Sequence, residues 1–302
     1  MKESTKIMMK KHGWRFDRFI HNYIYFKFYY PYVKCVYYFF KYLSEYLSWF
    51  KPLNGVLSMA FARYHSKVLS FGDTKKILTL QENISAISPE NKKIVPYKYA
   101  YKIIFQEPEH IAVMDCPCKI ILGDQDENIN SCLAIGKGLS SFWLEHGDKK
   151  YHARKISQKD ALDLIEKFRR MGYVTQAFFK VATGGSTGVI CNCHPDTCVS
   201  LQATKFAKKV DKKFTMNANS GYAVKRDDEK CKYHGNCAEV CPVEAIKVDK
   251  KKKEFSYDKD ACLGCELCVE HCPENALFAY RDVSKNMPLD IDMIRKEYVK
   301  QG

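Results

Sequence analysis

The chain has 302 residues, of which 46% are hydrophobic and 28% charged, a composition that excludes a collagen-like fibre and a largely disordered protein. Its formal net charge of +14 favours negatively charged partners, such as acidic proteins, anionic lipid or nucleic acid. Fourteen cysteines occur without a recognisable secretory signal, so we expect reduced, metal-bound thiols in the cytoplasm in preference to disulfides.

The first 51 residues are aromatic and basic. They include 18 aromatic side chains, ten basic ones and three acidic ones. Lys27, Lys34 and Lys41 recur every seven residues, which places them near one edge of a helix. A transmembrane helix is not expected, because it needs about 20 residues with few charges. The sequence predicts a helical segment over residues 1–70, which either lies on an anionic membrane through residues 14–50, docks a partner, or packs on the body of the protein.

The next elements lead to the first cysteine cluster. Residues 52–95 are expected to be connecting structure, and a helical pattern follows over Val95–Phe105. The apolar run Ile111–Met114 predicts a short buried strand. This strand would deliver Cys116 and Cys118 at its end.

A helix and a hairpin are predicted further along the chain. Ser157 and Asp160 have the spacing of a capping box, and the helix that they begin would end at Gly172. Tyr173–Val181 and Val189–Cys193 flank a glycine-rich run, as the two strands of a hairpin do. The second strand would lead to another cysteine cluster.

An internal repeat with a constant offset of 31 residues lies near the C-terminal end. The residues Cys231, His234, Cys237, Cys241, Pro242 and Ala245 recur as Cys262, Cys265, Cys268, Cys272, Pro273 and Ala276. The second copy has the C-x2-C-x2-C-x3-C-P spacing of bacterial ferredoxins, in which the fourth cysteine of each run ligates the other cluster. Such a loop wraps one cluster with three thiolates while backbone N–H groups face the sulfides.

Crossed ligation assigns two clusters. One 4Fe-4S cluster would be held by Cys262, Cys265, Cys268 and Cys241, and the second cluster by Cys231, His234, Cys237 and Cys272. Because His234 stands where the repeat has a cysteine, three alternatives are open for the second cluster. The imidazole ligates iron and raises the reduction potential, or a 3Fe-4S cluster forms, or a 4Fe-4S cluster takes a non-protein ligand.

A third cysteine constellation lies upstream of the repeat. It consists of Cys116, Cys118, Cys132, Cys191, Cys193 and Cys198, with His194 among them. We expect each Cys-x-Cys pair to lie in a loop, on the view that its two side chains do not point the same way from a regular strand or helix. A subset of these thiols would bind a third iron-sulfur cluster or structural zinc, and the alternative is inert buried cysteine.

Several motifs carry a resemblance to a known family. They are Val95–Tyr97, Ile111–Cys118, Cys132–Gly136, Ile156–Leu162, Ile190–Cys193 and Ser220–Ala223. Together they resemble a family of ferredoxin-domain proteins from anaerobes, over about residues 90–290. Lys119 replaces the arginine of that family's Cys-Pro-Cys-Arg run, and His194 and Asp196 stand in a stretch that is often richer in cysteine. The resemblance implies redox work and oxygen sensitivity.

The predicted fold is α+β. It has an aromatic helical N-terminus at 1–70, a mixed Cys-rich domain at 90–222, a duplicated 2×(4Fe-4S) ferredoxin domain at 223–284 and a helical tail at 285–302. The predicted function is single-electron transfer between a donor and an acidic redox partner, by an electron carrier or oxidoreductase subunit that is cytoplasmic or peripheral on a membrane.

Two other functions compete with electron transfer. One is a reductase whose incompletely protein-ligated cluster binds substrate, and the other is a docking or assembly subunit with structural zinc. No dinucleotide or phosphate-loop motif supports a stand-alone enzyme. Nucleic-acid binding is not expected, because the lysine runs lack interleaved aromatic residues.

Overall fold

We describe the protein from a computed structural model. The described residues are 6, 9, 24, 27–39, 42, 64–87, 102–122, 129–180, 187–210 and 215–298. Most of the predicted N-terminal segment and the predicted helical stretch from Val95 to Tyr101 lie outside these residues.

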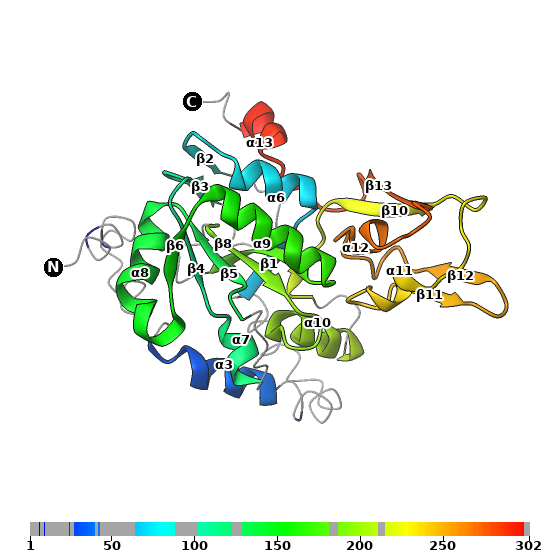
Figure 1. The fold of residues 1–302 in the computed structure, drawn as a ribbon, viewed down its shortest axis with the longest axis horizontal. Coiled ribbons are helices and arrows are strands. Elements are labelled where there is room, and N and C mark those ends of the chain that lie inside the picture. The colour runs from blue at the N-terminus through cyan, green and yellow to red at the C-terminus, as the bar shows by residue number, and fades with distance from the viewer. Residues whose placement is uncertain are drawn as a thin grey trace.

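The larger part of the chain is built on one seven-stranded sheet (Figure 1), with the order β6-β4-β5-β8-β7-β1-β9. The strands are β1 (Tyr64–Val68), β4 (Ile111–Met114), β5 (Cys132–Ile135), β6 (Arg154–Ile156), β7 (Val174–Lys180), β8 (Val189–Cys193) and β9 (Asn217–Ala218). Neighbouring strands are antiparallel except β1 and β9, which are parallel. We call this part, with its helices, the sheet domain.

Both faces of the sheet are buried. Successive side chains of a strand point to opposite faces, so neighbouring residues enter two different hydrophobic cores. Ile111 and Val113 of β4 belong to one hydrophobic core, whereas Ala112 and Met114 belong to the other. The first core is covered by α6 (Phe71–Leu78), α9 (Gln158–Arg170) and α13 (Ile291–Tyr298), and the second by α8 (Lys137–Tyr151), α10 (Val199–Val210), α7 (Pro117–Ile121) and α3 (Tyr29–Tyr38).

Local sequence signals account for α9 and the hairpin that follows. The Ser157 side chain accepts a hydrogen bond from the Asp160 N–H, and the Asp160 carboxylate accepts one from the Ser157 N–H, which confirms the predicted capping box. The next two strands, β7 and β8, pair antiparallel in the predicted hairpin.

Residues 64–105 differ from the prediction. Instead of an N-terminal segment followed by a connection, they supply β1, α6 and the hairpin of β2 (Ile84–Ile87) with β3 (Lys102–Phe105). The predicted helical pattern at Val95–Phe105 is therefore wrong at Lys102–Phe105. Strand β1 lies deep inside the fold, where Lys67 is fully buried and donates hydrogen bonds to the carbonyl oxygens of Asn219 and Met287.

The rest of the chain forms a C-terminal module whose elements recur at the offset of 31 residues. Strand β10 (Tyr222–Arg226) pairs with β13 (Leu277–Arg281), and β11 (Ile246–Asp249) pairs with β12 (Glu254–Tyr257). Helices α11 (Asn236–Glu239) and α12 (Leu267–Glu270) occupy matching positions.

The left-handed residues of the module repeat as well. Tyr233, Gly235 and Glu244 have positive φ, and so do their matches Gly264, Glu266 and Asn275. The predicted C-terminal tail contains α13, which packs against α6 and β2. No helix in the described part of the chain is long and apolar enough to cross a bilayer.

Candidate metal centres

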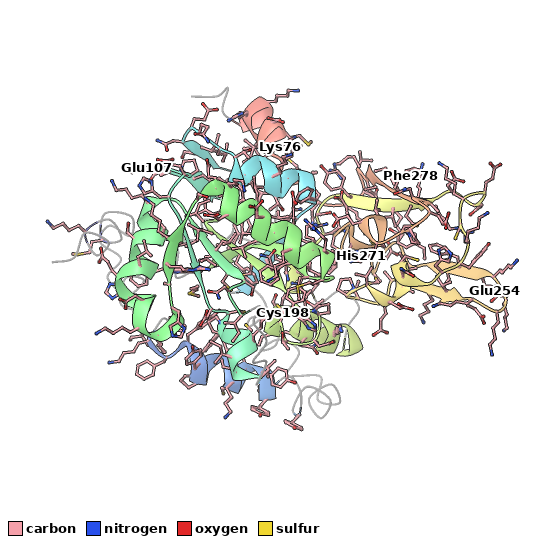
Figure 2. The ribbon with its side chains drawn as sticks, in the orientation of Figure 1. Lys76, Glu107, Cys198, Glu254, His271 and Phe278 are labelled. Atoms are coloured by element: carbon pink, nitrogen blue, oxygen red, sulfur yellow. The ribbon has the colours of Figure 1, made fainter. Side chains whose placement is uncertain are left out.

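The upstream cysteines converge at one end of the sheet. Strands β4, β5 and β8 are neighbours, and Met114, Cys132 and Cys191 lie side by side in their register. The six cysteines come from the N-cap and first turn of α7 (Cys116, Cys118), the start of β5 (Cys132), the end of β8 (Cys191, Cys193) and the residue before α10 (Cys198). We call these residues the six-thiol pocket; Figure 2 labels Cys198 beside α10.

One expectation about these cysteines is wrong. Cys191 and Cys193 do not lie in a loop, because both belong to strand β8. Residues i and i+2 of a strand face the same side of the sheet, so both thiols enter the same hydrophobic core. Only the pair Cys116 and Cys118 lies at a turn, where β4 gives way to α7.

The thiols contact one another closely. The Cys191 Sγ lies 3.3 Å from the Cys132 Sγ. Hydrogen bonds from Cys118 and then Cys132 hold the pKa of the Cys116 thiol well below its usual range, and they raise the pKa of both donors. A hydrogen bond between Cys198 and Cys193 raises the pKa of Cys193. The six thiols therefore lie together in one cluster.

Two residues that the sequence did not single out for this role surround the pocket. The Lys119 side chain is 1% exposed, and its Nζ donates to the Tyr173 hydroxyl at 3.0 Å and lies 4.3 Å from the centre of that ring. Tyr29 of α3 is half-buried against the core that holds the thiols, and desolvation, followed by Cys118 and Cys132, raises its pKa. A buried lysine and an aromatic ring thus lie on the elements that carry or pack against the thiols.

The described part of the N-terminal segment packs on the sheet domain. The Tyr30 ring of α3 meets Tyr151 edge to face at 5.2 Å, and the Lys150 Nζ donates to the Lys27 carbonyl oxygen at 2.6 Å. The opposite side of this segment carries exposed Phe28 and Tyr32. Packing on the body, one of the alternatives left open by the sequence, therefore applies to α3.

The cysteines of the C-terminal module lie in its two matched loops. Cys265 and Cys268 are buried. Their burial raises the pKa of Cys265 to about 12 and raises the pKa of Cys268 further, and in both cases Cys241 and Cys262 add to the shift. Metal ions bind thiolates, so a metal must displace the protons that burial favours on these sulfurs.

Backbone N–H groups point at the cysteine sulfurs of both loops. The Ala245 N–H donates to the Cys241 Sγ at 3.2 Å, and the matching Ala276 N–H donates to the Cys272 Sγ at 3.3 Å. N–H groups that offset thiolate charge are what an iron-sulfur cluster requires from its loop. The residues present therefore fit such a cluster.

The His234 position differs from its match in the repeat. A surface pocket is lined by Cys231, His234, Cys237 and Cys272, which are the predicted ligands of the second cluster. The His234 side chain is 44% exposed and its Nε2 lies 3.8 Å from the Glu274 carboxylate, whereas Cys265, at the equivalent place, is 8% exposed. The imidazole thus stands at the open rim of this pocket.

Comparison with known proteins identifies the module. Residues 223–286 match the family model described as 4Fe-4S dicluster domain. These residues form a 4Fe-4S dicluster domain. The match leaves the six-thiol pocket outside the matched residues.

Curated relatives are similar over this dicluster domain. The Hydrogenase-2 operon protein HybA of Escherichia coli O157:H7 is 46% identical over 57 residues, which are 18% of this chain and 17% of HybA. The Pyruvate synthase subunit PorD of Methanocaldococcus jannaschii is 41% identical over 56 residues, which are 18% of this chain and 64% of PorD. The chain therefore spans less than two thirds of either relative.

A buried arginine joins the dicluster domain to the sheet domain. Arg169, in the last turn of α9, is 2% exposed and binds the Glu270 carboxylate through Nε and Nη2. The same Nη2 donates to the Cys265 carbonyl oxygen at 2.7 Å. Beside it, the His271 ring contacts the Arg170 carbonyl oxygen, at the junction visible in Figure 2. No sequence motif pointed to this role of Arg169.

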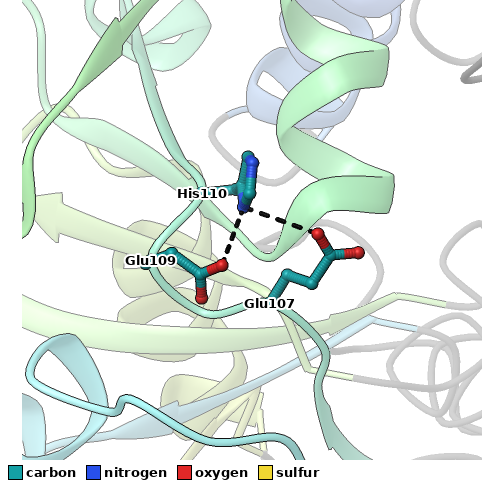
Figure 3. Close-up of side chains that lie close together, drawn as sticks. All are labelled: Glu107, Glu109 and His110. Carbon is teal, nitrogen blue, oxygen red and sulfur yellow. Dashed lines mark ion pairs between the residues drawn. The ribbon is translucent and has the colours of Figure 1, made fainter.

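A separate group of possible ligands lies at the other end of β4. Glu107, Glu109 and His110 bring their ligand atoms within 4.8 Å of one another (Figure 3), on an exposed turn. The His110 Nδ1 lies 3.2 Å from Glu109, and Lys137 Nζ lies 3.5 Å from Glu107. These ion pairs account for the cluster.

Proposed function

We propose that the protein transfers single electrons between a donor and a redox partner protein, through two clusters of the dicluster domain and a third centre in the six-thiol pocket. It acts as an electron carrier or as the electron-transfer subunit of an oxidoreductase. The observation that carries this proposal is the pair of matched loops, whose half-buried and buried thiols and sulfur-directed N–H groups suit cluster ligation.

The grouping of the thiols supports crossed ligation. The pKa of Cys268 responds, after its burial, to Cys265, Cys262 and Cys241, the last of which comes from the other loop. The pKa of Cys237 is raised by burial and then by Cys272, again from the other loop. We therefore assign Cys262, Cys265, Cys268 and Cys241 to one 4Fe-4S cluster, and Cys231, His234, Cys237 and Cys272 to the second cluster.

Metal analysis of protein purified without air tests the proposal. About seven or eight irons are expected in the dicluster domain alone, depending on whether the second cluster has three or four irons, with about eight acid-labile sulfides in either case. Cys241→Ala should remove the electron paramagnetic resonance signal of the cluster at Cys265, whereas Cys35→Ser, outside all the clusters, should change nothing. Colourless protein without iron at these loops contradicts the proposal.

A second candidate function is supported by the pocket at His234. Because this pocket is open to the surface, an iron there that lacks a fourth protein thiolate can bind a small molecule. The protein would then be a reductase. Turnover of a small substrate by the isolated, reduced chain distinguishes this candidate from an electron carrier, which reduces only a protein partner. A docking subunit with structural zinc would instead show zinc bound at the six-thiol pocket.

The partner and location follow from charge and from the relatives. The relatives are named for a hydrogenase operon and a pyruvate synthase, which supports a partner that is itself a redox protein. The net charge of +14 favours an acidic partner. We place the protein in the cytoplasm, with the aromatic N-terminal segment at residues 14–50 able to meet an anionic membrane surface.

A further inference from the structure

We infer that the six-thiol pocket binds a third iron-sulfur cluster and that this cluster exchanges electrons with the one at Cys265 across the buried side chain of Arg169. The electron-exchange part rests on the proposed function of the dicluster domain. The metal site itself stands on the sheet domain alone, which lies outside the residues matched to the dicluster family.

The donor set selects the class of metal centre. Soft thiolates select zinc or iron-sulfur clusters among the common protein metals. Structural zinc takes four ligands, but six thiols converge here, and a cluster can use thiols that a single tetrahedral ion cannot reach. The chain of contacts from Cys118 through Cys116 and Cys132 to Cys191 spreads these sulfurs along the strand ends, as ligands of a multi-iron centre must be spread.

The charge around the pocket suits an anionic centre. A 4Fe-4S cluster in its 2+ state with four thiolates carries a net charge of about −2, which is costly to bury without a nearby cation. Lys119 follows Cys118 in the chain, and its buried Nζ is held by the ring and hydroxyl of Tyr173. Tyr29 of α3 packs against the same hydrophobic core as the thiols.

Hydrogen bonds link strand β8, which carries two of the thiols, to the dicluster domain. Asn192 lies between Cys191 and Cys193 on β8, with its side chain on the opposite face of the sheet from theirs, and its Oδ1 accepts a hydrogen bond from the Thr175 hydroxyl at 3.3 Å. Arg169 Nη1 donates to that hydroxyl at 3.4 Å, and Arg169 Nη2 donates to the Cys265 carbonyl oxygen.

Hydrophobic packing also joins the six-thiol pocket to the loop of Cys265. Leu263, Cys265 and Leu267 belong to the same hydrophobic core as Cys191 and Cys193. The six-thiol pocket and the loop of Cys265 are therefore parts of one packed interior.

The redox step is a one-electron exchange. The third cluster loses one electron as the cluster at Cys265 gains it, or the reverse, and no bond is made or broken and no proton moves. The external donor and acceptor are the redox partners of the proposed function. The second cluster, at His234, then lies at the solvent-facing end of a series of three centres.

Iron content tests the third cluster. The full chain is reconstituted without air with ferrous iron, sulfide and an equal amount of zinc, and about four irons per chain beyond those of the dicluster domain are expected. Cys132→Ala and Cys193→Ala should each lose those extra irons while the dicluster signals remain, and Cys35→Ser should lose none. One zinc per chain that disappears in both variants, or iron content unchanged in both, overturns the inference.

The dicluster signals keep this test separate from the proposed function. If those signals are absent from the unmodified chain, the proposed function fails. If they are present and the extra irons are absent, only the further inference fails.

The role of Arg169 is tested by redox titration followed by electron paramagnetic resonance. Arg169→Gln should lower the midpoint potential of the cluster at Cys265 and weaken its magnetic coupling to the third cluster. Arg169→Lys, which keeps the charge, should restore most of the potential. Arg170→Gln is the matched control, because the exposed Arg170 side chain pairs with Glu166 within α9 and not, among the described residues, with the dicluster domain. If potential and coupling in Arg169→Gln equal those of the control, Arg169 does not connect the centres.

Discussion

Buried ionisable side chains are concentrated where the sheet domain meets the C-terminal part of the chain. Lys67, Arg169 and Asp73 are each 2% exposed or less. Burial lowers the pKa of Lys67 well below its usual range, while Arg169 is held by a carboxylate. A buried charge is tolerated only with partners such as these, so each residue ties its strand or helix to one particular neighbour.

Asp73 makes folding stability depend on pH. Its burial raises its pKa to about 6, against the opposing effects of a Ser70 hydrogen bond and of the nearby Lys76 and Lys67. Because the folded state holds this proton more tightly, its contribution to stability is full below about pH 3.8 and is lost as pH rises through about 6, a change of roughly 3 kcal/mol.

The Asp73→Asn variant isolates this effect. Urea unfolding of the apo chain between pH 4 and 7.5 should show the free energy of unfolding of the wild type falling relative to the variant as pH rises. A constant difference between the two proteins across that range would contradict the assigned pKa.

His234→Cys tests the ligand of the second cluster. If the imidazole binds iron, a thiolate in its place adds negative charge and should lower the midpoint potential of that cluster by an amount on the order of 100 mV. A 3Fe-4S cluster should instead convert to a 4Fe-4S cluster, with a changed resonance spectrum. An unchanged spectrum and potential would mean that residue 234 does not ligate iron, and His271→Cys, at a residue bound to backbone oxygens, serves as the control.

Among the elements, the two cluster loops share backbone shape but not surroundings. Tyr233 and Gly264 are equivalent in the repeat and both have positive φ. A Cβ on Gly264 would come within 2.3 Å of the Tyr222 carbonyl oxygen and of the Ser220 hydroxyl. The second loop therefore requires glycine, both for its left-handed backbone and for its close approach to the segment before β10.

Gly264→Ala should push the second cluster loop away from Ser220 and from the start of β10. We expect a loss of stability of about 2 kcal/mol or more and loss of the cluster at Cys265, because the carbonyl cannot move without displacing β10. Gly72→Ala is the matched control, since the nearest atom to its Cβ would lie 3.9 Å away, and it should be neutral or slightly stabilising. Equal cluster content in both variants would show that the contact is dispensable.

The elements that the sequence predicted are those whose signals are local. The capping box at Ser157 is read from residues close in sequence, and the structure has it. Strand β1 was missed because its partners β7 and β9 are more than 100 residues away. The burial of β1, including that of Lys67, is set by those partner strands and not by an alternation of apolar and polar residues along β1.

In the candidate sites, too, residues with a local sequence signal were predicted and residues placed by tertiary packing were not. The sequence identified the cysteines of the six-thiol pocket. The expectation that Cys191 and Cys193 lie in a loop was wrong, because residues spaced by two on a strand face the same side and can both enter one site. Tyr29 and Arg169 reach the centres only through tertiary packing, so no motif could have assigned their roles.

For the whole molecule, the charge of +14 should govern association with a partner. Electron transfer with an acidic partner protein should slow by about tenfold or more between 20 and 500 mM salt, because screening removes long-range attraction. Stopped-flow reduction by an acidic donor protein measures this, and a small uncharged mediator is the control that should show little dependence. A rate that does not fall with salt would exclude electrostatic recognition.

The packing of α3 beside the six cysteines bears on the order in which the chain folds and a third cluster would be inserted. Tyr29 is synthesised before every cysteine that it covers, and those cysteines are complete only once Cys198 has been made. If the proposed third cluster forms, its iron and sulfide reach the thiols most readily before α3 packs against the same hydrophobic core. We therefore expect cluster insertion to come before the N-terminal helix settles.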